Sequence, residues 1–163
     1  MPRKSPFEWR ILVHMFYGTH PINIDAKGRV IIPVRYRPDL EAGLFVTYGI
    51  DHCIWVLPIE KWEEVEAKAQ AMAMPSNFKR LLFAGEPAKL DNQGRLTLPA
   101  ELRRYAGLVE TDDTGAETLV DTVIVTGAEE RIEIWQPERW RALAAKAGQA
   151  GEVFQEHLSK LGL

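Results

Sequence analysis

An internal repeat constrains the fold of this chain more than any other feature of its sequence. Residues 21–37 align with residues 87–103, and six identical residues recur at a constant offset of 66. They are Pro21, Asp25, Gly28, Arg29, Pro33 and Arg37, which match Pro87, Asp91, Gly94, Arg95, Pro99 and Arg103. Residues 49–69 also align with residues 127–147, at an offset of 78. Such self-similarity marks a repeated structural unit, so we expect two copies of one module.

The two offsets differ by twelve residues, which indicates an insertion in the second copy. It falls within residues 109–121, VETDDTGAETLVD, a polar segment that is rich in acids and turn-forming residues. Segments of this composition usually run over the surface of a protein. We therefore expect an elaborated surface loop at this position.

Short apolar runs separated by turns predict a β-rich module. Ile22 and Ile24 alternate with polar residues, a turn follows at residues 26–28, and a second apolar run ends at Pro33. Later runs rich in β-branched and aromatic residues predict further strands, and each copy closes with an amphipathic helix, over 59–74 and 137–147. The fold class expected is α+β, with strands dominant and short flanking helices.

One module with four short strands cannot bury enough apolar surface to be stable alone, because it has only about 45 residues. We expect the two copies to pair with each other and interleave their hairpins. The expected organisation is an N-terminal extension over 1–14, a first module over 15–74, a linker helix over 75–87, a second module over 88–147 and a helical tail over 148–163.

Composition excludes several classes of protein. The chain is 46% hydrophobic, as in ordinary globular proteins, but lacks both a run long enough to span a membrane and a signal peptide, so we expect a cytoplasmic protein. A single cysteine, Cys53, rules out an internal disulfide, and the four histidines lack the spacing of metal ligands. We expect no metal and no cofactor.

No catalytic motif stands out. The sequence has no glycine-rich phosphate loop, no Gly-x-Ser-x-Gly and no His-Glu-x-x-His. Glu129 and Glu130 are adjacent in an expected turn and have no metal-binding residue beside them in the sequence. We therefore expect neither enzyme activity nor a small-molecule substrate.

Charge is unevenly distributed along the chain, although the net charge is only −3. Residues 22–37 hold four cationic residues against one acid, whereas residues 107–138 hold nine acids against one arginine. This asymmetry suggests one face for an anionic partner and another that avoids it. The alternative is a solvated loop that is merely acidic.

The shared motif Asp-x-x-Gly-Arg is the candidate functional element. Gly28 and Gly94 supply the positive φ of a tight turn, and Asp25 and Asp91 can hold that turn through its backbone amides or pair with the arginine. A two-stranded ribbon fits the major groove of DNA, where an arginine can donate two hydrogen bonds to guanine. The expected DNA-contacting residues of these turns are Arg29, Lys27 and Arg95. The alternative is that the arginines only staple their turns.

Four more arginines, Arg35, Arg37, Arg103 and Arg104, follow the predicted second strand of each copy. They could bind phosphates and fix the register of the protein on double-stranded DNA. The alternative for them is ordinary surface charge. The second turn is less cationic than the first, because Gln93 replaces Lys27.

Residues 15–37, the second motif over 90–108 and the closing segment 131–140 resemble the MraZ family, a double version of the AbrB-type swapped-hairpin domain. The resemblance implies two tandem modules that form a small barrel of double-psi type. It also implies a nucleoid-associated transcriptional regulator that binds short direct repeats in the promoter of the division and cell wall gene cluster. Such proteins assemble into closed homo-oligomeric rings. The family's Asp-x-x-x-Arg motif falls on Asp25–Arg29 and Asp91–Arg95, and its DNA-contacting arginine falls on Arg29.

The chain departs from the family pattern in three places. Family members usually begin at the position of Met15, so we expect residues 1–14 to be either an extension or the result of a wrongly chosen start codon. Tyr17 stands where a basic residue is common. The acidic segment 109–121 should lie away from DNA if the resemblance holds.

Two other functions are compatible with the sequence. The chain could be an interaction ring in which the basic loops are only structural, or an antitoxin that wraps a toxin with a disordered tail. The helical pattern of residues 151–163, GEVFQEHLSKLGL, argues against the antitoxin.

Overall fold

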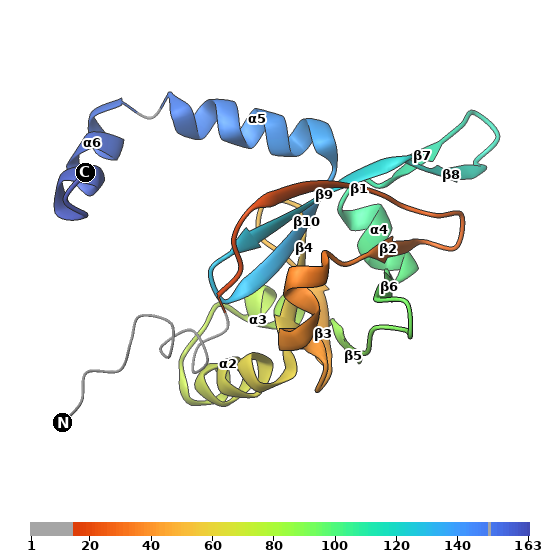
Figure 1. Cartoon of the computed structure of the whole chain (residues 1–163), viewed down its shortest axis with the longest axis horizontal. Coiled ribbons are helices and arrows are strands. Elements are labelled where there is room, and N and C mark those ends of the chain that lie inside the picture. Colours follow the sequence, from red (N-terminus) through yellow and green to blue (C-terminus); the bar gives the residue numbers. More distant parts are fainter. Residues whose placement is uncertain (1–14, 150) are drawn as a thin grey trace.

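The computed structural model describes residues 15–149 and 151–163, which form a mixed α+β body dominated by strands (Figure 1). The expected extension over 1–14 lies outside the described residues. In the two described ranges, no helix is both long and apolar enough to cross a lipid bilayer.

The two copies exchange strands in one six-stranded antiparallel sheet of order β1-β9-β10-β4-β3-β5. The strand bounds are β1 (Thr19–Asn23), β3 (Leu44–Tyr48), β4 (Ile54–Pro58), β5 (Glu86–Ala88), β9 (Thr122–Ala128) and β10 (Arg131–Trp135). β1 of the first copy pairs with β9 of the second, and β5 of the second pairs with β3 of the first. At the centre, β4 pairs with β10 across the copies. The copies are therefore interleaved, as the repeat predicts.

The small double-psi barrel is not found among the described residues. β1 and β5 end the sheet on opposite sides and do not pair with each other, so the sheet stays open. The chain leaves this sheet at the end of β1 and turns into β2 (Arg29–Ile31), which belongs to a separate two-stranded ribbon. Only the bridge between Ile24 and Val30 links the two, which is too little pairing to close a barrel.

The separate ribbon also joins the two copies. β2 pairs antiparallel with β6 (Arg95–Thr97), so that Arg29 is opposite Thr97 and Arg95 is opposite Ile31. Successive side chains of a strand point to opposite faces. Val30 and Leu96 accordingly point inward and are fully buried in the main core, while the other four side chains face outward.

Short helices flank the strands: η1 (Val34–Leu40), α2 (Ile59–Ala71), α3 (Ser76–Phe83), α4 (Ala100–Tyr105), α5 (Pro137–Gly148) and α6 (Gly151–Lys160). η1 is a 3-10 helix that contains Pro38, whereas its counterpart α4 is α-helical. The linker helix expected over 75–87 is wrong at its end. It stops at Phe83, and Glu86–Ala88 forms β5 instead, because Gly85 packs against the backbone of β3 too closely for any side chain.

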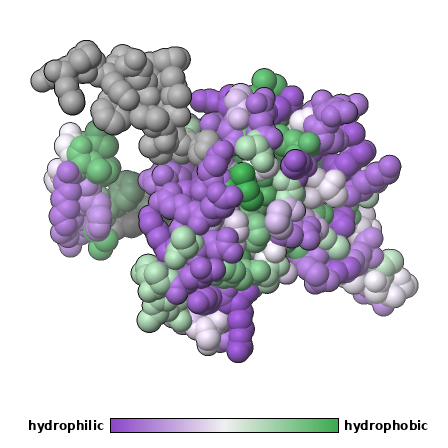
Figure 2. Space-filling model, turned by 90° about the horizontal axis from the view of Figure 1, so that it is seen from below, coloured by the Kyte–Doolittle hydropathy of each residue, from purple (hydrophilic) through white to green (hydrophobic). Residues whose placement is uncertain are grey.

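The inserted segment is a β-hairpin of β7 (Val109–Thr111) and β8 (Glu117–Leu119) rather than an irregular loop. Figure 1 shows it at the same end of the molecule as β2 and β6. The core lies between the large sheet, the ribbon, η1 and α4, and Tyr36 and Phe16 meet edge to face within it. The face seen in Figure 2 is mostly polar, with apolar side chains gathered in smaller areas.

The ribbon supplies a test of this packing. Leu96→Ala should lower the free energy of unfolding by about 2–5 kcal/mol, because Leu96 is 1% exposed and its loss leaves a cavity. Ile31→Ala, on the opposite face of the same ribbon and 50% exposed, should change it by less than about 0.5 kcal/mol. Urea denaturation of both variants measures the difference, and equal effects would contradict the inward orientation of Leu96.

Candidate nucleic-acid interface

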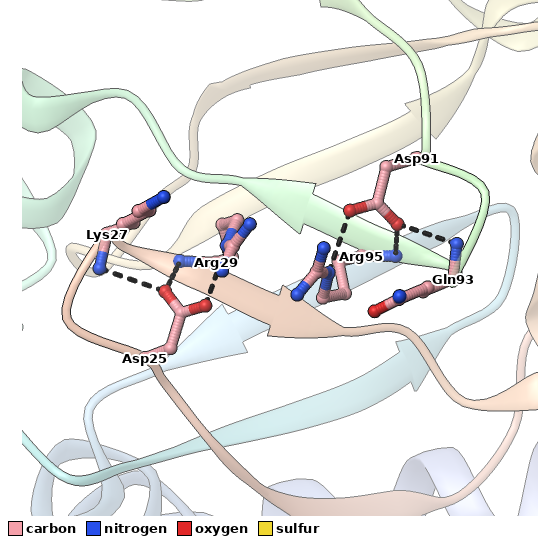
Figure 3. A network of polar contacts seen from close by, with 6 residues as sticks. All are labelled: Asp25, Lys27, Arg29, Asp91, Gln93 and Arg95. Atoms are coloured by element: carbon pink, nitrogen blue, oxygen red, sulfur yellow. Dashed lines mark hydrogen bonds and ion pairs between the residues drawn. The ribbon is translucent and has the colours of Figure 1, made fainter.

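The first Asp-x-x-Gly-Arg motif forms a tight turn held by the aspartate (Figure 3). Asp25 Oδ1 accepts hydrogen bonds from the backbone N–H groups of Lys27 and Arg29, at 3.0 and 2.9 Å. Gly28 donates its N–H to the Asp25 carbonyl at 2.9 Å and has a φ of 77°, a conformation that favours glycine. The turn therefore needs both the carboxylate and the glycine.

The second motif repeats this geometry in every bond. Asp91 Oδ1 accepts from the N–H groups of Gln93 and Arg95, each at 2.9 Å, and Gly94 has a φ of 75°. In Figure 3 the two turns lie at opposite ends of the ribbon. The antiparallel pairing of β2 with β6 causes this arrangement, because each turn precedes its own strand.

Each aspartate also forms an ion pair with the arginine of its own motif. Arg29 Nε lies 2.6 Å from Asp25 Oδ2, and Arg95 Nε lies 2.7 Å from Asp91 Oδ2. The pKa of each carboxyl is held below its ordinary value. The backbone N–H of the arginine makes the largest contribution to this lowering, and its guanidinium makes a smaller one. No hydrogen bond between described residues uses the Nη atoms of either arginine. About a quarter of each arginine side chain is open to solvent, 26% for Arg29 and 25% for Arg95.

The tip of the inserted hairpin shows that the turn does not require the arginine. Asp112 accepts from the N–H groups of Thr114 and Ala116, at 2.8 and 3.0 Å, and Gly115 has a φ of 83°. This is the same turn for a third time, with Ala116 at the position that Arg29 and Arg95 occupy. The alternative for Arg29 and Arg95 is that they only staple their turns. The backbone geometry of this turn does not need such a staple, because it also forms with Ala116.

The outward face of the ribbon brings the two arginines together. Arg29 and Arg95 sit diagonally across β2 and β6 (Figure 3). By strand alternation, Ile31 and Thr97 share their face. Ile31 and Thr97 are exposed, and neither was among the residues expected from the motifs. Strand alternation could have identified them, because they lie two positions beyond Arg29 and Arg95.

Arg37 and Arg103 brace the turns rather than extending into solvent. Each is partly buried against the turn of the other copy: Arg103 covers Gly28, where an added Cβ would lie 2.5 Å from Nη1, and Arg37 covers Gly94. Arg37 Nε also donates to the Ile32 carbonyl at 2.8 Å. Their recurrence at an offset of 66 thus reflects a reciprocal contact between the copies.

The other expected contacts differ in how exposed their charge is. Lys27 and Arg35 are exposed, and the Arg35 guanidinium lies 5.9 Å from the ring centre of Tyr36. Arg104 is exposed too, but it is paired with Glu101 and Glu117. The Glu117 carboxylate raises the pKa of Arg104 and has its own pKa lowered in return.

The base of the acidic hairpin is not remote from the first turn. Asp25 and Ala26 line a polar hollow of about 490 Å³ together with Arg103, Arg104 and residues 117–121. The second strand of the acidic segment therefore lies beside the first basic turn, while the expectation that the segment lies away from DNA stays a prediction. The physical reason is that β8 continues into β9, which pairs with β1 just before that turn.

Two strand-exchanged copies that place an arginine pair on a shared ribbon define a tandem-repeat protein with a candidate nucleic-acid interface. The family described as "MraZ protein, putative antitoxin-like" matches residues 15–85 and 82–157. This chain belongs to the MraZ family.

Relatives named "Transcriptional regulator MraZ" match over most of their length. The protein of Symbiobacterium thermophilum is 42% identical over 85% of this chain and 94% of its own. That of Acetivibrio thermocellus is 34% identical over 91% of this chain and its own full length. That of Saccharopolyspora erythraea is 39% identical over 78% of this chain and 85% of its own.

The turns should respond to acid in a predictable way. Because the pKa values of Asp25 and Asp91 are depressed in the folded state, their contribution to stability is present above pH 3.8, the ordinary aspartate value, and is lost as the pH falls through the folded values. Carboxyl-carbon NMR titration should place the pKa values of Asp25 and Asp91 below 3.8. Midpoints at or above 3.8 would contradict the bonding described.

Proposed function

We propose that this protein is a sequence-specific DNA-binding transcriptional regulator that places the β2–β6 ribbon in the major groove. The observation that carries the proposal is the pair of arginines, Arg29 and Arg95, on the outer face of that ribbon. A two-stranded ribbon has the dimensions to enter the major groove, where guanine presents two acceptors to an arginine.

The ion pairs favour base contacts over general attraction to DNA. Asp25 and Asp91 compensate the charge of the arginines, so the pairs add little long-range attraction to phosphates. They also fix each guanidinium through Nε and leave the Nη donors directed to a partner. Ile31 and Thr97 lie beside them, where an apolar side chain can contact a thymine methyl and a hydroxyl can bond to a base.

The remaining cations would anchor the ribbon. Lys27 and Arg35 are exposed and could bind phosphates. Arg37 and Arg103 instead pack against the turns of the opposite copy. The relatives are named as transcriptional regulators, which supports the same function here. We extend the proposal to a homo-oligomeric ring on the nucleoid of the cytoplasm, with several ribbons on short direct repeats in the promoter of the division and cell wall gene cluster.

Arg29→Ala tests the proposal directly. It should weaken binding to promoter repeats by roughly 10–100-fold, because one bidentate base contact is worth about 1–3 kcal/mol. Arg95→Ala should act in the same direction. Fluorescence anisotropy measures both effects, with DNA taken from the region upstream of the gene that encodes this protein. Footprinting on the same DNA supports the measurement.

Arg141→Ala is the matched control, since Arg141 is an exposed arginine on α5, outside the ribbon, and should leave binding unchanged. Charge reversal at Arg29 distinguishes a DNA-binding regulator from an interaction ring. If the protein is only an interaction ring, the variant should leave DNA binding and its salt dependence unchanged. An antitoxin requires a disordered toxin-wrapping tail, whereas residues 151–160 form α6. Light scattering should show one assembly size for all variants, so that a loss of binding reports the contact itself.

A further inference from the structure

The inserted hairpin holds Arg104 in a contact that imitates binding to a phosphate. Arg104 Nε and Nη2 donate to the two carboxylate oxygens of Glu117, at 2.7 and 3.0 Å, so both oxygens are engaged in parallel. Carboxylates and phosphates take the same fork of donors from arginine. With both side chains partly open to solvent, at 45% and 40% exposure, a DNA phosphate could compete for the same donors.

The contact occurs at one end of the ribbon only. Arg104 and Glu117 line the hollow that also includes Asp25 and Ala26 of the first turn. At the offset of 66, the first copy has Pro38 in place of Arg104, and it lacks the twelve inserted residues. The two ends of an otherwise symmetric ribbon therefore differ in charge and in the donors they offer.

We propose that Glu117 occupies Arg104 and so suppresses sequence-independent DNA binding beside the first turn. This inference rests on the proposed function. A phosphate contact at Arg104 would strengthen binding to every sequence equally, because phosphates carry no base information. With Arg104 occupied, a larger share of the affinity depends on Arg29 and Arg95, which face the bases.

Glu117→Gln is the test. A random-sequence duplex of about 30 bp is the probe, because a phosphate contact forms on any DNA sequence. The variant should bind this duplex several-fold more tightly at low salt. The slope of log affinity against log salt should steepen by about 0.9. Binding to promoter repeats should tighten by the same factor, so that the ratio of the two affinities stays unchanged.

Glu110→Gln is the matched control. Glu110 is exposed on the same hairpin and precedes Thr111, the partner of Glu117, by one position, so its side chain points to the opposite face of the hairpin. The substitution Glu110→Gln removes the same negative charge as Glu117→Gln. It should leave the slope unchanged. The double variant Arg104→Ala/Glu117→Gln should return to the wild-type slope. Thermal unfolding of each variant checks that the hairpin remains folded.

Equal gains for Glu117→Gln and Glu110→Gln would overturn the inference, since overall charge would then explain both. An unchanged slope in a folded Glu117→Gln protein would overturn it as well. Either result leaves the proposed function intact if Arg29→Ala still weakens promoter binding. Failure of the wild-type protein to bind promoter DNA overturns the proposed function, and this inference with it.

Discussion

The pairing of β2 with β6 is the constraint on which the rest of the structure depends. Each strand has only three residues, and each finds its partner in the other copy. Flanking bonds from Ile32 to Gly94 and from Leu98 to Gly28, at 2.9 and 2.8 Å, extend the pairing on both sides. Val30 and Leu96 are buried in the main core when β2 and β6 of the two copies are paired. The face that contains both arginines therefore requires both copies.

One turn is used three times, and its side chains decide what each copy can do. An aspartate and a glycine are sufficient for the backbone geometry, as the hairpin tip demonstrates with Ala116. Where arginine replaces that alanine, the same aspartate that builds the turn also orients a guanidinium. The carboxylate lowers the net charge of the ribbon at the same time, which suits recognition of bases better than general attraction to a polyanion.

The insertion breaks a symmetry that the repeat would otherwise impose. Without it, Arg37 and Arg103 would brace two turns of the same backbone geometry, and the two ends of the ribbon would differ mainly in Lys27 and Gln93. β8 leads directly into β9, and this places acidic residues beside the first turn and a carboxylate on Arg104. The internal repeat explains the symmetric part, and the twelve inserted residues of the second copy explain the asymmetric part.

The sequence by itself determined the two copies, the Asp-x-x-Gly-Arg turns and the short strands, because these follow from repeats, local hydrogen bonds and residue alternation. It left open whether Asp25 holds its turn through backbone amides or pairs with Arg29. Only the tertiary structure decided which copy each strand pairs with, that β5 replaces the end of a helix, and that Arg37 and Arg103 cross over to the opposite turn. It also brought Glu117 to Arg104. These outcomes depend on contacts between residues distant in the chain, where packing rather than local preference selects the partner.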